Sequence, residues 1–202
     1  MARVKGTMLI DCVKTIRADK RGQFDQFLTV GDRKIISERI LPSAWYPYQT
    51  YRNCLSAVST VAGNNNAQTL RQWGWRYSEA LISGIYRGII KDGEPIQSLE
   101  KYSIHVHNLF DFGEMQAVPF SSQEAEMVMR GFDPDFQPQY HLMRGWLERS
   151  VEMCGASDVR SDFSMRSWEG APETRISLFW QMARERKIMH RDYRAHEEEL
   201  PI

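Results

Sequence analysis

The sequence predicts an α+β protein, in which an N-terminal helical half packs on a C-terminal antiparallel sheet of β-β-α-β-β order. Apolar residues recur at helical spacing as far as about residue 111, and the period then changes to alternation. One strongly amphipathic segment interrupts the alternating part. We therefore expect one domain over residues 1–181, with a helical part over 1–111 and a sheet part over 112–181, followed by a charged tail over 182–202.

Composition narrows the functional class. Of the 202 residues, 42% are hydrophobic and 26% are charged, which is typical of a globular domain. The 26 basic residues balance 26 acidic ones, so the chain has no overall field that would hold nucleic acid. No run of about 18 apolar residues and no signal-peptide core is present. These features predict a cytoplasmic protein that neither inserts into membranes nor binds nucleic acid.

Cysteines are few and widely separated. Cys12, Cys54 and Cys154 form neither a CxxC pair nor a Cys/His cluster. The pattern is not that of a structural zinc site or of a disulfide framework. Three free thiols predict a reducing compartment and no metal site.

Three short helices are expected at the start of the chain. The first ends toward Gly22, the second covers about residues 24–28, and the third is capped by Asp32 and ended by Pro42. The residues that define the inward faces of the first and third helices are Leu9, Cys12, Val13, Ile16, Ile35, Ile36 and Ile40.

Two longer helices follow. One begins at Pro47 and runs to about Ala62, and Asn66 is a natural N-cap for the next. The apolar stripe of the second helix is Trp73, Tyr77, Leu81, Ile85 and Ile89.

Glycines are unusually frequent near this stripe. Gly74, Gly84 and Gly88 each reduce helix propensity, by about 1 kcal/mol relative to alanine. Such glycines are usually kept because another backbone or a ligand comes close. The commoner explanation is helix packing.

The remaining elements are separated by a helix-breaking segment over residues 91–95 and a turn at Glu169-Gly-Ala-Pro, which predicts a hairpin. In order, we expect a helix over about 95–108, strands over about 115–120 and 125–130, a helix over about 138–154, and strands over about 159–166 and 175–180.

Three stretches, taken in order and spacing, carry a resemblance. They are Lys5-Gly-Thr-Met, Ile40-Leu-Pro-Ser-Ala-Trp-Tyr-Pro and Leu109-Phe-Asp-Phe-Gly-Glu. They resemble an uncharacterised deltaproteobacterial-type family that is similar to heme-NO-binding (H-NOX) domains and to V4R and Bet3-type domains. The resemblance spans about residues 5–180 and implies a fold that binds heme, small hydrophobic ligands or other proteins, without catalysis.

Heme is one ligand that the resemblance implies. In H-NOX domains a histidine on the helix before the sheet ligates iron, and a Tyr-x-Ser-x-Arg motif holds the propionates. His105 and His107 occupy the corresponding helix. The segment over residues 128–135 lacks the tyrosine and serine of the motif, so the propionates would lose their charge-assisted partners. We therefore expect no cofactor.

A hydrophobic small molecule is a second possible ligand. Trp45, Tyr46, Trp73 and Tyr77, together with His105 and His107, would line a cavity between the helical half and the sheet. Large aromatic residues also fill protein cores without binding anything. Both interpretations of these residues stay open.

Catalysis is not predicted. The chain contains no Gly-x-Ser-x-Gly elbow and no glycine-rich phosphate loop. Six tryptophans and ten methionines exceed what a small core needs, and both residue types are enriched at interfaces. We expect a non-enzymatic sensor or adaptor that acts through protein–protein contact, as a homodimer or with a partner. The alternative is a small-molecule sensor with heme or a hydrophobic ligand in the helix–sheet cleft.

Overall fold

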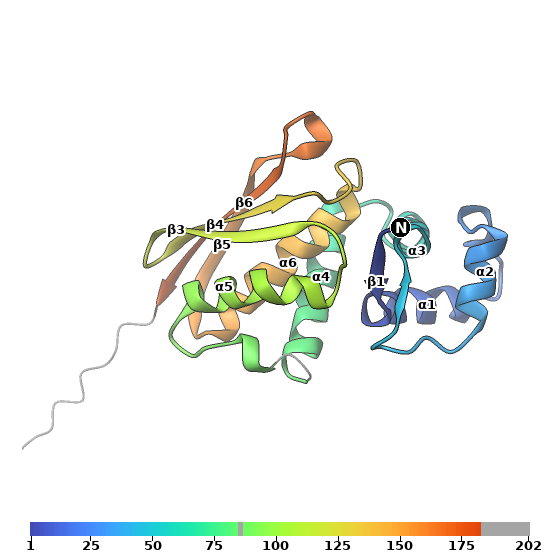
Figure 1. Ribbon diagram of the computed structural model, residues 1–202, viewed down its shortest axis with the longest axis horizontal. Coiled ribbons are helices and arrows are strands. Elements are labelled where there is room, and N and C mark those ends of the chain that lie inside the picture. The colour runs from blue at the N-terminus through green and yellow to red at the C-terminus, as the bar shows by residue number, and fades with distance from the viewer. Residues whose placement is uncertain (85–86, 183–202) are drawn as a thin grey trace, which may run out of the picture.

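The computed structural model describes residues 1–84 and 87–182. Within these residues it contains six α-helices, a two-stranded sheet and a four-stranded antiparallel sheet (Figure 1). The predicted α+β class is confirmed. Two predicted features, the stripe residue Ile85 and the charged tail beyond Met182, lie outside the described residues.

The first part of the chain holds three helices and a small two-stranded sheet. Its elements are β1 (Arg3–Lys5), α1 (Gly6–Ala18), α2 (Val30–Ser37), β2 (Trp45–Pro47) and α3 (Tyr48–Val61). Strands β1 and β2 pair antiparallel, which brings the start of the chain beside the start of α3. Short strands of this kind carry little alternation, and the sequence did not predict them.

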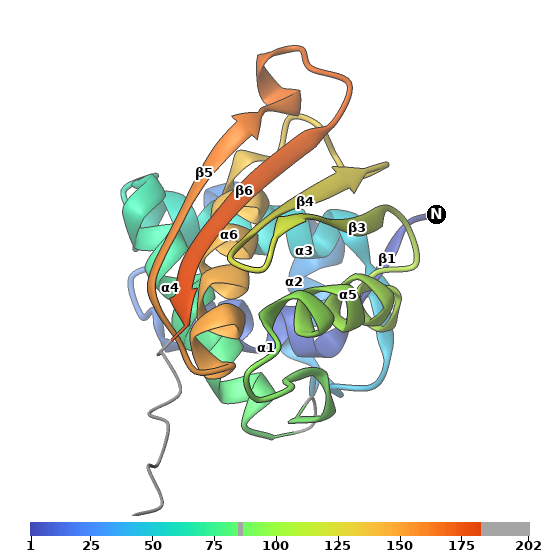
Figure 2. The same ribbon diagram turned by 90° about the vertical axis from the view of Figure 1, so that its left-hand side faces the viewer.

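The second part holds the larger sheet and three helices. Its elements are α4 (Ala67–Ile82), α5 (Pro95–His105), β3 (Glu114–Ser121), β4 (Glu124–Arg130), α6 (Gln137–Met153), β5 (Ala156–Met165) and β6 (Thr174–Met182). The sheet order is β3-β4-β6-β5, and every neighbouring pair is antiparallel. Helices α5 and α6 lie on one face of the sheet (Figure 2). Met127, Ile176 and Leu178 are fully buried at the centre of the sheet.

Helix α2 begins earlier than the sequence predicts. Thr29, not Asp32, is the N-cap, and Asp32 is the third helical residue of a capping box. The Asp32 carboxylate accepts hydrogen bonds from the Thr29 backbone N–H at 2.9 Å and from Asn53 Nδ2 at 2.7 Å. The buried carboxylate therefore joins α2 to α3.

Helices α4 and α6 touch backbone to backbone. A Cβ atom on Gly74 would overlap the carbonyl oxygen of Leu142, and one on Gly145 would overlap that of Arg71. The packing explanation for Gly74 is thus confirmed. Among the described residues, no atom lies within 4 Å of the virtual Cβ of Gly88, and Gly84 has only ordinary contacts, so no close approach within that part of the chain explains these two.

The α4–α6 contact predicts that Gly74→Ala is strongly destabilising. The added methyl has no space, so the helices must separate, at a cost of about 3 kcal/mol or more in the free energy of unfolding. Gly31→Ala is the matched control, since its virtual Cβ lies 3.6 Å from its nearest neighbour within α2. Urea denaturation measures both variants. Equal stability of the two would contradict the packing role of Gly74.

Asp32 predicts a pH-dependent contribution to stability. Burial raises the pKa of its carboxyl, but hydrogen bonds from Asn53 and Thr29 outweigh burial and hold it below the usual 3.8. Its stabilising contribution is therefore present above the unfolded pKa and is lost as pH falls through the lower folded value. The difference in urea midpoint between the wild type and Asp32→Asn should be constant above pH 5 and shrink below pH 4. A difference that does not change with pH would refute this.

Candidate functional site

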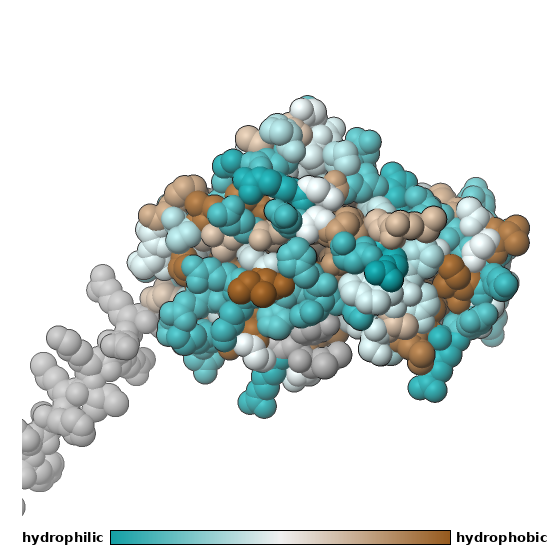
Figure 3. Space-filling view, viewed as in Figure 1, coloured by the Kyte–Doolittle hydropathy of each residue, from teal (hydrophilic) through white to brown (hydrophobic). Residues whose placement is uncertain are grey.

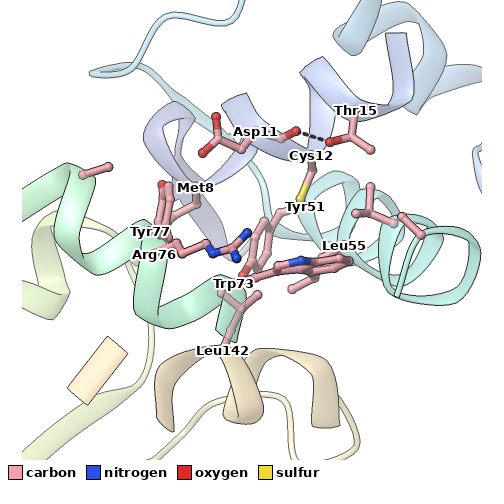
Figure 4. A pocket seen from close by; sticks show the side chains of 13 residues that line it. Met8, Asp11, Cys12, Thr15, Tyr51, Leu55, Trp73, Arg76, Tyr77 and Leu142 are labelled. Atoms are coloured by element: carbon pink, nitrogen blue, oxygen red, sulfur yellow. Dashed lines mark hydrogen bonds between the residues drawn. The ribbon is translucent and has the colours of Figure 1, made fainter. Parts of the chain in front are cut away.

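A groove opens between helices α1, α3 and α4, with Leu142 of α6 at its base (Figure 4). Its volume is about 370 Å³. Its walls are mainly apolar and include Met8, Leu55, Val58 and Trp73. This volume falls within the range of small-molecule sites in proteins.

Helical spacing places these side chains. Met8 and Cys12 are four residues apart on α1, and Trp73 and Tyr77 are four apart on α4. On α3, Tyr51 and Leu55 have the same spacing. Residues at this spacing share one helix face, so each helix presents one apolar stripe to the groove.

The floor of the groove is electrically neutral. Burial raises the pKa of the Cys12 thiol, and the nearby Cys54 and Asp11 add to the effect. Burial also raises the pKa of the Tyr51 hydroxyl well above its ordinary value. Both groups are thus protonated at neutral pH, so Cys12 is not an activated nucleophile. The floor suits an apolar ligand.

Tyr77 separates the groove from the interior. Its hydroxyl donates to the carbonyl of Thr7 on α1, and its ring packs edge-on against Trp146 of α6 at a centroid distance of 5.3 Å. Tyr102 of α5 also contacts Trp146, with a centroid distance of 5.6 Å. These three aromatic rings, here named the aromatic seam, fill the space between α4, α5 and α6.

The site residues predicted from sequence lie in three places, the groove, β2 and the end of α5. Trp73 and Tyr77 lie together in the groove. Trp45 and Tyr46 lie on β2 outside its lining, with the Lys5 ammonium 4.1 Å from the centre of the Trp45 ring. The Tyr46 hydroxyl accepts a hydrogen bond from the backbone N–H of Leu41 at 2.9 Å.

Neither His105 nor His107 is a buried residue. His105 is paired with the Asn108 side chain at 2.9 Å, and His107 is exposed. The buried residues of this segment are instead Leu99, Tyr102 and Val106.

Sequence reasoning missed the groove residues of α1 and the cation on α4. Met8 was assigned no role, although its spacing to Cys12 places it on the same face. Arg76 stands between two aromatic residues in the sequence and lies at the mouth of the groove. Its spacing of three residues from Trp73, which puts both side chains on one face of α4, was the available signal.

The loop between β4 and α6 carries an acid where an arginine-bearing motif was sought. Asp133 accepts a hydrogen bond from Arg52 Nε at 2.8 Å and from the Tyr48 hydroxyl at 3.2 Å. Arg52 and Tyr48 both belong to α3. This loop therefore fastens α3 to the sheet-bearing part and offers no free cation.

Metal and membrane features were searched over residues 1–84 and 87–182. In that part of the chain no three His, Cys, Asp or Glu side chains come together in a way that could hold a metal ion. No helix there is long and apolar enough to cross a membrane.

Solved structures of H-NOX proteins share the fold. An H-NOX protein from S. oneidensis in the Fe(II)NO state aligns with a TM-score of 0.63 and 9% identity, covering 88% of this chain and 99% of that one. Unliganded Fe(II) H-NOX from K. algicida aligns with a TM-score of 0.62 and 11% identity, and the alignment covers 89% of this chain and 97% of that one. The oxygen complex of an oxygen-binding H-NOX domain related to soluble guanylate cyclases aligns with a TM-score of 0.58 and 16% identity. The alignment covers 88% of this chain and 95% of that one.

No protein-family model and no curated protein sequence matches the chain. At these identities the structural comparisons establish the H-NOX fold. The predicted relation to V4R and Bet3-type domains, and to a deltaproteobacterial-type family, stays a prediction.

The fold comparison corrects the main functional prediction. An adaptor that acts through protein–protein contact is wrong, because the proteins that share this fold are described by their iron and gas-ligand states. The surface agrees with this correction. Among the described residues of the face seen in Figure 3, apolar residues are scattered between hydrophilic ones and form no continuous patch. The comparison favours the alternative, a small-molecule sensor with heme or a hydrophobic ligand.

Proposed function

We propose that this protein is a non-enzymatic sensor domain of H-NOX fold that binds a small hydrophobic molecule in the groove between α1, α3 and α4. The observation that carries the proposal is the groove itself. It combines a volume of about 370 Å³, apolar walls from three helices and a protonated floor. Burial of apolar ligand surface there would supply the affinity, at about 25 cal/mol per Å² before the costs of association.

Heme does not fit the residues present. His105 is half-buried with its ring paired to Asn108, and His107 is exposed. The aromatic seam of Tyr77, Tyr102 and Trp146 fills the space between α4, α5 and α6. The β4–α6 loop, residues 131–136, carries no cation that could pair with a propionate, and its Asp133 carboxylate is already bound to Arg52. The ligand we propose is therefore not a heme.

The position of the groove gives ligand binding a route to a conformational signal. Helices α1 and α3 belong to the first part of the molecule, while α4 is fixed to α6 in the second part (Figure 1). A ligand between α3 and α4 touches both parts, so it would favour one relative position over others. Such a shift requires differential affinity for the two arrangements. The loop that joins α3 to α4 includes Asn64 and Asn65, both at positive φ.

Blocking the groove tests this proposal. Ala80 is exposed at the groove and lies on α4, so Ala80→Trp should fold normally and occupy the space that the ligand needs. The matched control is Ala18→Trp, an exposed alanine on α1 outside the groove lining. We expect a copurifying or added apolar ligand, seen by native mass spectrometry, with the wild type and Ala18→Trp but not with Ala80→Trp. Retention by all three would place the ligand elsewhere, and an empty wild type tested with apolar probes would defeat the proposal.

The absorption spectrum of the purified protein tests whether it binds heme. Protein purified from cells supplied with heme precursor should show no Soret band, because neither His105 nor His107 is a buried residue. The double variant His105→Ala, His107→Ala should give the same spectrum as the wild type. A stoichiometric Soret band that the double variant loses would restore the heme hypothesis.

A further inference from the structure

The guanidinium of Arg76 lies at the mouth of the groove. The residue is exposed on α4, and within the described part of the chain no ion pair, hydrogen bond or aromatic contact engages its guanidinium. Figure 4 shows the side chain reaching across the groove toward Tyr51 and Trp73. Its charge therefore faces the space that a ligand would occupy.

The other charge at the mouth is already balanced. Asp11 pairs with Lys14 at 3.0 Å on the same helix, and Figure 4 shows its carboxylate turned away from Arg76. The mouth consequently carries one uncompensated positive charge above an apolar, protonated floor.

Arg76 also lines a second, polar groove, but the acids of that groove are engaged by other side chains. The polar groups of this second groove are paired with one another: Arg71 binds Glu148 at 2.6 Å, and Trp75 Nε1 donates to Glu152 at 2.8 Å. Their carboxylates are thus already engaged by α4 partners other than Arg76. The apolar groove is the place where the Arg76 charge lacks a counterpart.

We infer that the ligand of the groove is an amphipathic monocarboxylate, whose hydrocarbon part lies on the floor and whose carboxylate pairs with Arg76. This inference rests on the proposed function and names its ligand class. The planar guanidinium matches a carboxylate through two parallel N–H···O bonds. A single unpaired cation balances one negative charge, so a monoanion fits the mouth better than a phosphate dianion would.

Isothermal titration calorimetry with two probes of equal chain length, decanoate and 1-decanol, tests the carboxylate inference separately from the proposed apolar groove. The wild type should bind decanoate about tenfold more tightly than decanol, as expected for one charge-assisted pair. Arg76→Met should remove this preference and leave the affinity for decanol unchanged. Arg39→Met, which removes an exposed arginine outside the groove lining, should behave as the wild type. Decyl phosphate serves as the dianionic probe.

The outcomes are distinct. Equal affinity of the wild type for decanoate and decanol, or a preference that Arg76→Met retains, would overturn the carboxylate inference while the groove remains a ligand site. Tighter binding of decyl phosphate than of decanoate would also overturn it. Failure of every probe to bind would count against the proposed function itself. Loss of the decanoate preference at high salt would support the ion pair, because added salt screens exposed charges.

Discussion

The backbone contact between α4 and α6 is the constraint on which the rest of the structure depends. Gly74 and Gly145 lie where each helix meets the other's carbonyl oxygens, so neither position accepts a side chain. The contact fixes α4 to the helix that covers the sheet. One side of α4 is then committed to α6, and the side that carries Trp73, Arg76 and Tyr77 is left to face α1 and α3. The groove is a consequence of that division.

Local sequence signals predicted the helices and strands well where one periodic pattern dominated. The stripe of Trp73 and Tyr77 identified α4, and alternation identified β4 and β6. The predicted helix boundaries were less accurate where a side chain can act either as an N-cap or as a residue within the first turn. Asp32 is a good N-cap by type, yet Thr29 takes that place, because the acid is then free to reach back to the Thr29 N–H and across to Asn53. The contact with Asn53 is tertiary, and local pattern does not contain it.

The candidate site was harder to predict, because helix faces are chosen by packing. Histidines on the helix before the sheet suggested an inward ligand, but Leu99, Tyr102 and Val106 follow the spacing of a buried face, and His105 lies off it. Arg76 had no signal in a propensity or a motif. Its role depends on which neighbours surround α4, and those neighbours are brought there by the Gly74 contact from parts of the chain far away in sequence.

Tyr77 belongs both to the aromatic seam, which disfavours heme, and to the groove, which favours an apolar ligand. Its ring belongs to the aromatic seam with Trp146, while the same side chain forms a wall of the groove and its hydroxyl binds the carbonyl of Thr7 on α1. The seam packs on one side of Tyr77, and the groove opens on the other. A ligand that displaced this ring would disturb both the contact with α1 and the packing on α6. Because interiors are densely packed, such a displacement is transmitted to neighbouring helices and not absorbed locally. The residue that closes the seam is thus also the residue best placed to report that the groove is filled.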